Sequence, residues 1–249
     1  MRRVFIFDID GTLTPSRQVM TKEFKEWFTK WGRKNNFYLV TGSDIEKVQE
    51  QLQGTEILAD GIFTCCGNEF WQSDPAVHPK FTEQIYRNKF KPPETLLTYL
   101  GEQLRFSEYE NRCGNHIENR GSLLNFSVVG RDCSYEDRLD YFEWDKKNGE
   151  REAIAKYIRH QWKDIDAVIG GQISIDIYPK GNDKSQVLDV IKQHQLPHAD
   201  EYIFIGDKMD EGGNDYPLAR LMDDKEDCEW FEIKDYHETQ KILQDYEII

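Results

Sequence analysis

Near its amino end the chain reads Val4-Phe5-Ile6-Phe7-Asp8-Ile9-Asp10-Gly11-Thr12-Leu13-Thr14. A short apolar run with strand character ends here in two aspartates, one residue apart. Such a strand places its carboxylates in the crevice where open α/β sheets bind ligands. One carboxylate can attack phosphorus and hold a divalent cation while the other transfers protons. Asp-x-Asp is also common in simple turns and helix caps, so the function depends on the rest of the chain.

Helices and strands alternate after this motif. Apolar residues recur at helical spacing over 21–31 and 45–52, and short buried strands are expected at 37–40 and 61–64. A helix over 184–191 and a strand over 202–205 resume the same pattern late in the chain. This alternation predicts an α/β fold with a doubly wound parallel sheet.

The middle of the chain has a different rhythm. The runs 123–129 and 173–178 alternate apolar and polar residues, as half-buried antiparallel strands do, and a helical stretch over 150–162 lies between them. We therefore expect a core domain formed by 1–78 and 183–249, with an inserted α+β domain at 79–182.

Composition excludes several classes of protein. The net charge of -14 and the pI of about 4.9 argue against a nucleic-acid partner. Five cysteines without zinc-site spacing favour thiols in a reducing cytosol. No apolar run approaches the roughly 20 residues of a membrane helix, and the amino end runs directly into a strand, which predicts no signal peptide. We expect a cytoplasmic protein with no membrane partner.

Polar residues follow other expected strands of the core. Thr41 and the backbone N–H groups of the residues that follow it, including that of Ser43, can hold a phosphoryl group at the start of a helix. Lys184 can neutralise charge on an aspartyl phosphate. Asp207 can complete a magnesium site, and the following Gly212-Gly213-Asn214-Asp215 adds oxygen ligands or loop turns. Each of these alone is also an ordinary loop, cap or surface residue.

Together the motifs resemble those of the haloacid dehalogenase superfamily of phosphotransferases. That superfamily requires this order: Asp8-x-Asp10, Thr41, Lys184 and Asp207. The resemblance implies a doubly wound parallel-sheet core, and it makes the inserted α+β domain a cap that closes over the site and excludes water.

The expected cap carries residues suited to a sugar phosphate. Arg120 lies at the edge of one strand, with Arg131 and Arg138 beyond its end, and guanidinium groups bind phosphate bidentately. Ser174 and Asp176 share one strand face and can bind sugar hydroxyls. Ordinary salt bridges and polar strand faces are the alternative explanation.

Long strings of sequence further resemble the eukaryotic-type phosphomannomutase family over nearly the whole chain. They are Asp8-Ile9-Asp10-Gly11-Thr12-Leu13-Thr14, Asn125-x-Ser127-x-x-Gly130-Arg131, Asp145-Lys146-Lys147, Gly170-Gly171-Gln172-Ile173-Ser174 and Gly206-Asp207-Lys208. The resemblance implies conversion of mannose 6-phosphate and mannose 1-phosphate through an aspartyl phosphate, with a hexose 1,6-bisphosphate as intermediate and activator.

The same resemblance implies a role for each site residue. Asp8 is the nucleophile, Asp10 the general acid and base, and Mg²⁺ is held by Asp8, the Asp10 backbone carbonyl and Asp207. Small hexose phosphates are the expected partners. The residues expected to bind them are Arg17, Thr41, Ser43, Arg120, Arg131, Arg138, Ser174 and Asp176.

The chain also departs from the family pattern. Cys65-Cys66-Gly67 stands where an Asn-Gly pair is common, and Asn182 replaces a Trp. The segment 68–114 matches poorly, and because that region helps to form the family's dimer, homodimerisation through the cap is in doubt.

Two other functions share these core residues. A magnesium-dependent sugar-phosphate phosphatase needs the same aspartates and lysine, but it has less need of three cap arginines, which favours the mutase. A non-catalytic sugar-phosphate sensor is disfavoured because Asp8, Asp10, Lys184 and Asp207 are all present.

Overall fold

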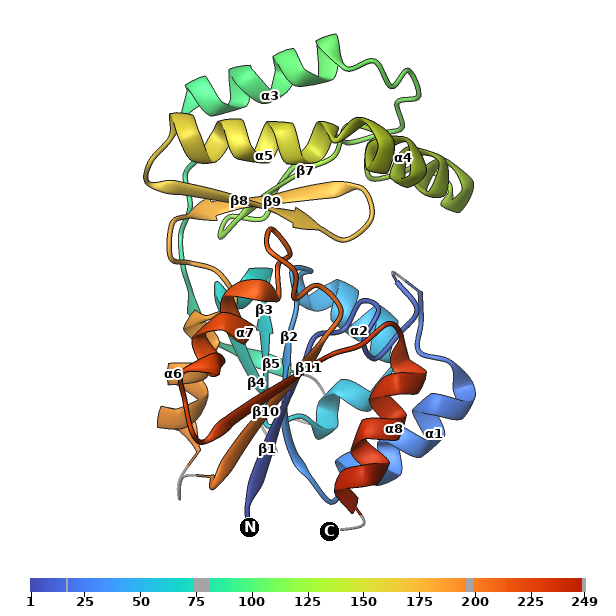
Figure 1. Cartoon of the computed structure of the whole chain (residues 1–249), viewed down its shortest axis with the longest axis vertical. Coiled ribbons are helices and arrows are strands. Elements are labelled where there is room, and N and C mark those ends of the chain that lie inside the picture. Colours follow the sequence, from blue (N-terminus) through green and yellow to red (C-terminus); the bar gives the residue numbers. More distant parts are fainter. Residues whose placement is uncertain (17, 74–80, 196–198, 248–249) are drawn as a thin grey trace. The chain divides into compact units, whose positions relative to one another are not determined.

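The computed structural model describes residues 1–16, 18–73, 81–195 and 199–247 (Figure 1). It divides the chain into a core unit, Met1–Arg87 with Asp183–Ile249, and a cap unit, Asn88–Asn182. The sequence placed the first boundary after residue 78. The structure places it after Arg87, because β5 (Phe81–Arg87) pairs with β4 (Glu69–Ser73) at the edge of the core sheet.

The core sheet has the strand order β11-β10-β1-β2-β3-β4-β5. Its parallel strands are β1 (Arg3–Phe7), β2 (Asn36–Val40), β3 (Gly61–Thr64), β10 (Glu201–Gly206) and β11 (Cys228–Glu232). The predicted parallel sheet is confirmed, whereas the antiparallel pair β4–β5 was not foreseen.

Helices cover both faces of this sheet (Figure 1). Phe5 and Phe7 of β1 pack with one group of helices, and Val4 and Ile6 pack with the other. The first group is α1 (Lys22–Gly32), α2 (Ile45–Leu52) and α8 (Tyr236–Glu247), and the second is α6 (Gln186–His194) and α7 (Tyr216–Asp223). A strand buried on both faces must be apolar throughout, which explains the continuous apolar run before Asp8.

The cap unit is an antiparallel sheet with helices packed on one face. Its strands, in the order β6-β7-β9-β8, are β6 (Ile117–Asn119), β7 (Leu124–Phe126), β9 (Ser174–Pro179) and β8 (Ile165–Gly170). Apolar residues of β7 and β9 pack with α3 (Glu94–Phe106), α4 (Tyr135–Asn148) and α5 (Glu150–Gln161). Because side chains alternate along a strand, Asn125, Ser174 and Asp176 face the other side.

Within the described part of the chain, we find no helix with the length and apolar character that crossing a membrane requires.

Candidate active site

The first aspartate of the motif continues the line of β1. The backbone N–H of Asp8 donates to the carbonyl of Ile205 at 3.0 Å, which keeps the end of β1 beside the end of β10. Gly11 in the following turn has φ of +86°, and a Cβ there would lie 2.5 Å from Oδ2 of Asp207. Only glycine lets the turn approach the Asp207 carboxylate so closely.

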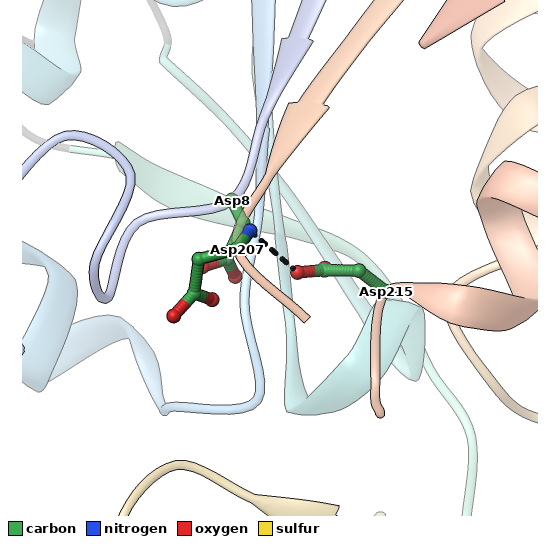
Figure 2. A group of neighbouring side chains, drawn as sticks. All are labelled: Asp8, Asp207 and Asp215. Carbon is green, nitrogen blue, oxygen red and sulfur yellow. Dashed lines mark hydrogen bonds between the residues drawn. The ribbon is translucent and has the colours of Figure 1, made fainter. Parts of the chain in front are cut away.

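Three carboxylates meet at these strand ends. Oxygen atoms of Asp8, Asp207 and Asp215 lie within 4.8 Å of one another. Figure 2 shows the backbone N–H of Asp207 directed at Asp215, whose Oδ2 it reaches at 3.2 Å. The same oxygen accepts from the N–H of Lys208 at 3.1 Å. Asp215 thus holds the loop that presents Asp207, where the sequence predicted only that the segment 212–215 adds oxygen ligands or loop turns.

Lys184 lies between two of these carboxylates. Its Nζ donates to Oδ1 of Asp8 and to Oδ1 of Asp215, both at 2.6 Å, and its side chain is fully buried. Burial by itself would lower the pKa of Lys184, but the two carboxylates outweigh it and raise that pKa, so the ammonium stays charged. The sequence predicted that a helix begins at Lys184. In the structure α6 begins at Gln186, and Lys184 lies in the turn before it.

Three carboxyl groups meet here with two ammonium groups, those of Lys184 and Lys208. Burial raises the pKa of Asp8, and the Asp215 and Asp207 carboxylates add to that rise while Lys184 opposes it. Burial also raises the pKa of Asp207 to about 6, although Lys208 Nζ donates to its Oδ2 at 2.6 Å. The closely spaced carboxylate oxygens of Asp8, Asp207 and Asp215 are a donor set that suits a hard divalent cation such as Mg²⁺.

Asp10 is held by a residue that the sequence interpretation missed. Nε2 of Gln51 donates to Oδ1 of Asp10 at 2.9 Å and to Oγ1 of Thr14 at 3.2 Å. Gln51 lies on α2 and is only 1% exposed. A polar residue on the apolar side of a helix, between Val48 and Leu52, was the available signal. The contact fixes the side chain expected to transfer protons.

The loop after β2 lies at the neighbouring strand end. Oγ1 of Thr41 accepts from the N–H of Ser43 at 3.1 Å, and both residues are buried. The N–H groups of Cys66 and Cys65 donate to the carbonyls of Thr41 and Ser43 at 2.8 and 2.9 Å. The two cysteines, in η2 (Cys65–Gly67), have positive φ angles, which strains non-glycine residues. The unusual cysteine pair therefore braces the expected phosphoryl loop.

Two of the three predicted arginines of the cap unit contact one glutamate. Oε2 of Glu118 lies 2.6 Å from Nη2 of Arg120 and 3.5 Å from Nε of Arg131. Arg131 Nη1 reaches Oγ of Ser174 at 3.5 Å, and Arg138 Nη2 donates to the Arg131 carbonyl at 3.1 Å. Glu118 thus links the guanidinium groups of Arg120 and Arg131, Arg131 contacts β9, and Arg138 contacts the backbone of Arg131.

Among the described residues, the buried polar atoms of the cap that have no hydrogen-bond partner include Nη1 of Arg138 and Oδ1 of Asn125. Asn125 Nδ2 donates to Oδ1 of Asp176 at 2.6 Å. A buried donor or acceptor without a partner is costly unless a ligand satisfies it, so Nη1 of Arg138 can donate to a ligand and Oδ1 of Asn125 can accept from one. Arg17, the remaining predicted contact, lies outside the described residues.

Comparison with known proteins finds relatives over most of the chain. The family model described as "Eukaryotic phosphomannomutase" matches residues 24–246. A phosphomannomutase of Encephalitozoon cuniculi is 35% identical over 238 residues, covering 89% of this chain and 86% of its own. The human phosphomannomutase 1 is 30% identical over 233 residues, covering 87% and 83%.

Solved structures show the same fold at lower sequence identity. A haloacid dehalogenase-like hydrolase from Bacteroides thetaiotaomicron has a TM-score of 0.61 at 15% identity, covering 99% of this chain and 100% of that one. The IMP-nucleotidase of Plasmodium falciparum has a TM-score of 0.64 at 17% identity, covering 100% and 68%. The predicted superfamily fold is confirmed.

Proposed function

The chain belongs to the eukaryotic phosphomannomutase family, and from this premise we propose that it interconverts mannose 6-phosphate and mannose 1-phosphate. The observation that carries the proposal is the group of three cap arginines, in which Nη1 of Arg138 is buried without a partner among the described residues. A mutase must hold the phosphate that is not reacting, and a guanidinium cluster with a remaining donor suits that task.

The core residues supply the phosphoryl transfer. The Asp8 carboxylate attacks phosphorus and forms an aspartyl phosphate, while the Lys184 ammonium offsets the charge on the transferred group. Asp10, oriented by Gln51, gives a proton to the departing hydroxyl oxygen and later takes one from the attacking hydroxyl. Thr41 and Ser43 hold oxygens of the phosphoryl group.

The oxygen donors of this site fit a magnesium ion. Asp8, Asp207 and the backbone carbonyl of Asp10 would hold Mg²⁺, which supplies charge neutralisation and orientation of the phosphoryl group when bound. Lys184 and Asp215 then keep the Asp8 carboxylate and the Asp207 loop in place.

The full cycle uses a hexose 1,6-bisphosphate as activator and intermediate. The bisphosphate donates one phosphoryl group to Asp8. The hexose monophosphate that binds next accepts this phosphoryl group from Asp8 on the hydroxyl at the end that carries no phosphate. The end that is not reacting is bound by Arg120, Arg131, Arg138, Ser174 and Asp176. The position of Arg17 matches that of a family arginine that holds substrate. Because these contacts accept either phosphate, the intermediate can bind in both orientations.

A sugar-phosphate phosphatase is the second candidate, because the same core residues serve hydrolysis. The test is ³¹P NMR of the protein with Mg²⁺, mannose 1-phosphate and a trace of hexose 1,6-bisphosphate. Growth of a 6-phosphate signal that depends on the bisphosphate establishes the mutase. Inorganic phosphate alone establishes the phosphatase, and no change over the Asp8→Asn control excludes both.

A further inference from the structure

A buried ion pair in the cap joins the end of α4 to the start of α5. Nε of Arg151 donates to Oδ2 of Asp145 at 2.7 Å, and the backbone N–H of Arg151 donates to Oδ1 at 2.8 Å. The two side chains are 5% and 8% exposed. Burying an ion pair is costly unless the remaining donors are also satisfied, so the other N–H groups of Arg151 must find acceptors.

The turn between β8 and β9 provides them. Nη1 of Arg151 donates to the carbonyl of Gly171 at 3.0 Å, and the carbonyl of Ser174 lies 3.5 Å away. Gly170 and Ser174 pair across this turn, and the hydroxyl of Ser174 is the one that Arg131 contacts. Arg151 therefore spans the base of the turn that presents Ser174.

The partner of Arg151 ties this turn to another arginine of the site. Asp145 and Arg138 both lie on α4, seven residues apart and so on the same side of the helix. Arg138 in turn donates to the carbonyl of Arg131. One chain of contacts thus runs from the Ser174 turn through Arg151 and Asp145 to the helix that carries Arg138.

We infer that Arg151 is a positioning residue for the cap phosphate site: it locks the β8–β9 turn to α4, so that Ser174, Arg131 and Arg138 present their donors in one arrangement. The inference rests on the proposed function. The planar guanidinium can bind the Asp145 carboxylate and the turn carbonyls together, which the single ammonium of lysine cannot do in the same geometry.

The test compares Arg151→Met, Arg151→Lys and the double variant Asp145→Asn with Arg151→Met. Arg151→Met leaves a buried unpaired carboxylate and lowers Tm, whereas the double variant contains no unpaired charge and regains most of that loss. If Arg151 positions the site, Arg151→Met and the double variant both raise the KM for mannose 1-phosphate on the order of tenfold or more, because the turn is no longer held. Their kcat changes much less, and Arg151→Lys gives an intermediate KM.

A matched control is Arg159→Met, which removes another α5 arginine whose contacts are Glu152 and the Ala167 carbonyl. Its KM is expected to equal that of the wild type. A wild-type KM in the stable double variant would show that the ion pair only supports the fold, and would overturn the inference.

A binding measurement separates this outcome from failure of the proposed function. Isothermal titration calorimetry gives the Kd of mannose 1-phosphate without turnover. A wild-type protein that binds the sugar phosphate but does not isomerise it refutes the mutase, and weaker binding by both Arg151 variants still supports the positioning role. Equal Kd values in wild type and variants, or no binding by any of them, refute that role.

Discussion

The core unit and the cap unit carry opposite charge at their candidate sites. In the core, the carboxylates of Asp8, Asp207 and Asp215 meet around one buried lysine. In the cap, the guanidinium groups of Arg120 and Arg131 share Glu118, and that of Arg138 donates to the carbonyl of Arg131. The three core carboxylates outnumber the two lysine ammonium groups that contact them, and the cap cluster retains a buried donor at Arg138 that has no partner among the described residues. A site of the first kind suits a cation and a transferred group, and one of the second kind suits a phosphate that stays intact.

The largest expected effect on this difference between core and cap comes from removing the proposed nucleophile of the core site. Asp8→Asn is expected to lower kcat by a factor on the order of 10⁴ or more, because an amide cannot form the aspartyl phosphate. The fold should persist, since the change removes one of several mutually repelling buried charges. Mutase rate and thermal unfolding are the measurements, with Asp189→Asn on the exposed side of α6 as control. Near-normal turnover would refute the assignment of Asp8.

Removing the lysine of the core should affect both stability and activity. Lys184→Met leaves Asp8 and Asp215 without their buried counter-charge, which costs about 3–5 kcal/mol of unfolding free energy. Urea unfolding measures the loss. Added Mg²⁺ should recover part of the lost unfolding free energy, since a cation restores the charge balance. A urea midpoint of Lys184→Met that does not change with Mg²⁺ would mean that the carboxylates become protonated instead.

In the cap, the corresponding change should act on binding alone. Arg138→Ala removes a charged contact worth about 1.5–3 kcal/mol and should raise the KM for mannose 1-phosphate by roughly tenfold or more. Mg²⁺ binding, which depends on the core carboxylates, should not change. Arg105→Ala, at an exposed position on α3, is the matched control. Equal KM values for both variants would remove Arg138 from the substrate site.

The core site should also respond to pH. Burial raises the pKa of Asp207 from 3.8 to about 6, so the folded, metal-free protein holds this proton more tightly than the unfolded chain. The stabilisation from this group is present below the unfolded pKa and is lost as pH rises through about 6. Without metal, Tm should therefore fall over this window, and the Tm gain from Mg²⁺ should be larger at pH 7.5 than at pH 5. A Mg²⁺ effect independent of pH would contradict the assignment of Asp207.

Sequence and structure differ in a consistent way across the two units. Asp8 and Asp207 could be predicted because carboxylates that follow buried strands meet at one edge of a parallel sheet. The link between Lys184 and Asp215 could not, since it joins side chains 31 residues apart through a three-dimensional contact. Gln51 was hidden in an apolar helix pattern, and the β4–β5 pair was missed because the turn-forming residues Ser73-Asp74-Pro75 suggested that the core pattern ends there.

The smallest expected effect concerns how one helix of each unit ends. In the cap, α4 is followed by Gly149 with φ of 67°, and in the core α2 is followed by Gln53 with φ of 50°. The left-handed region is strained for a side chain but not for glycine. Gln53→Gly should therefore stabilise the protein by about 0.5–1 kcal/mol, and Gly149→Ala should destabilise it by about 1 kcal/mol. Urea unfolding measures both free-energy changes, and kcat should stay unchanged for Gln53→Gly.

Because a Cβ at residue 149 would meet no atom within 4 Å, a loss of stability there reports backbone strain and not a clash. Shifts of the same sign in the two variants would mean that side-chain contacts, and not φ, decide how these helices end.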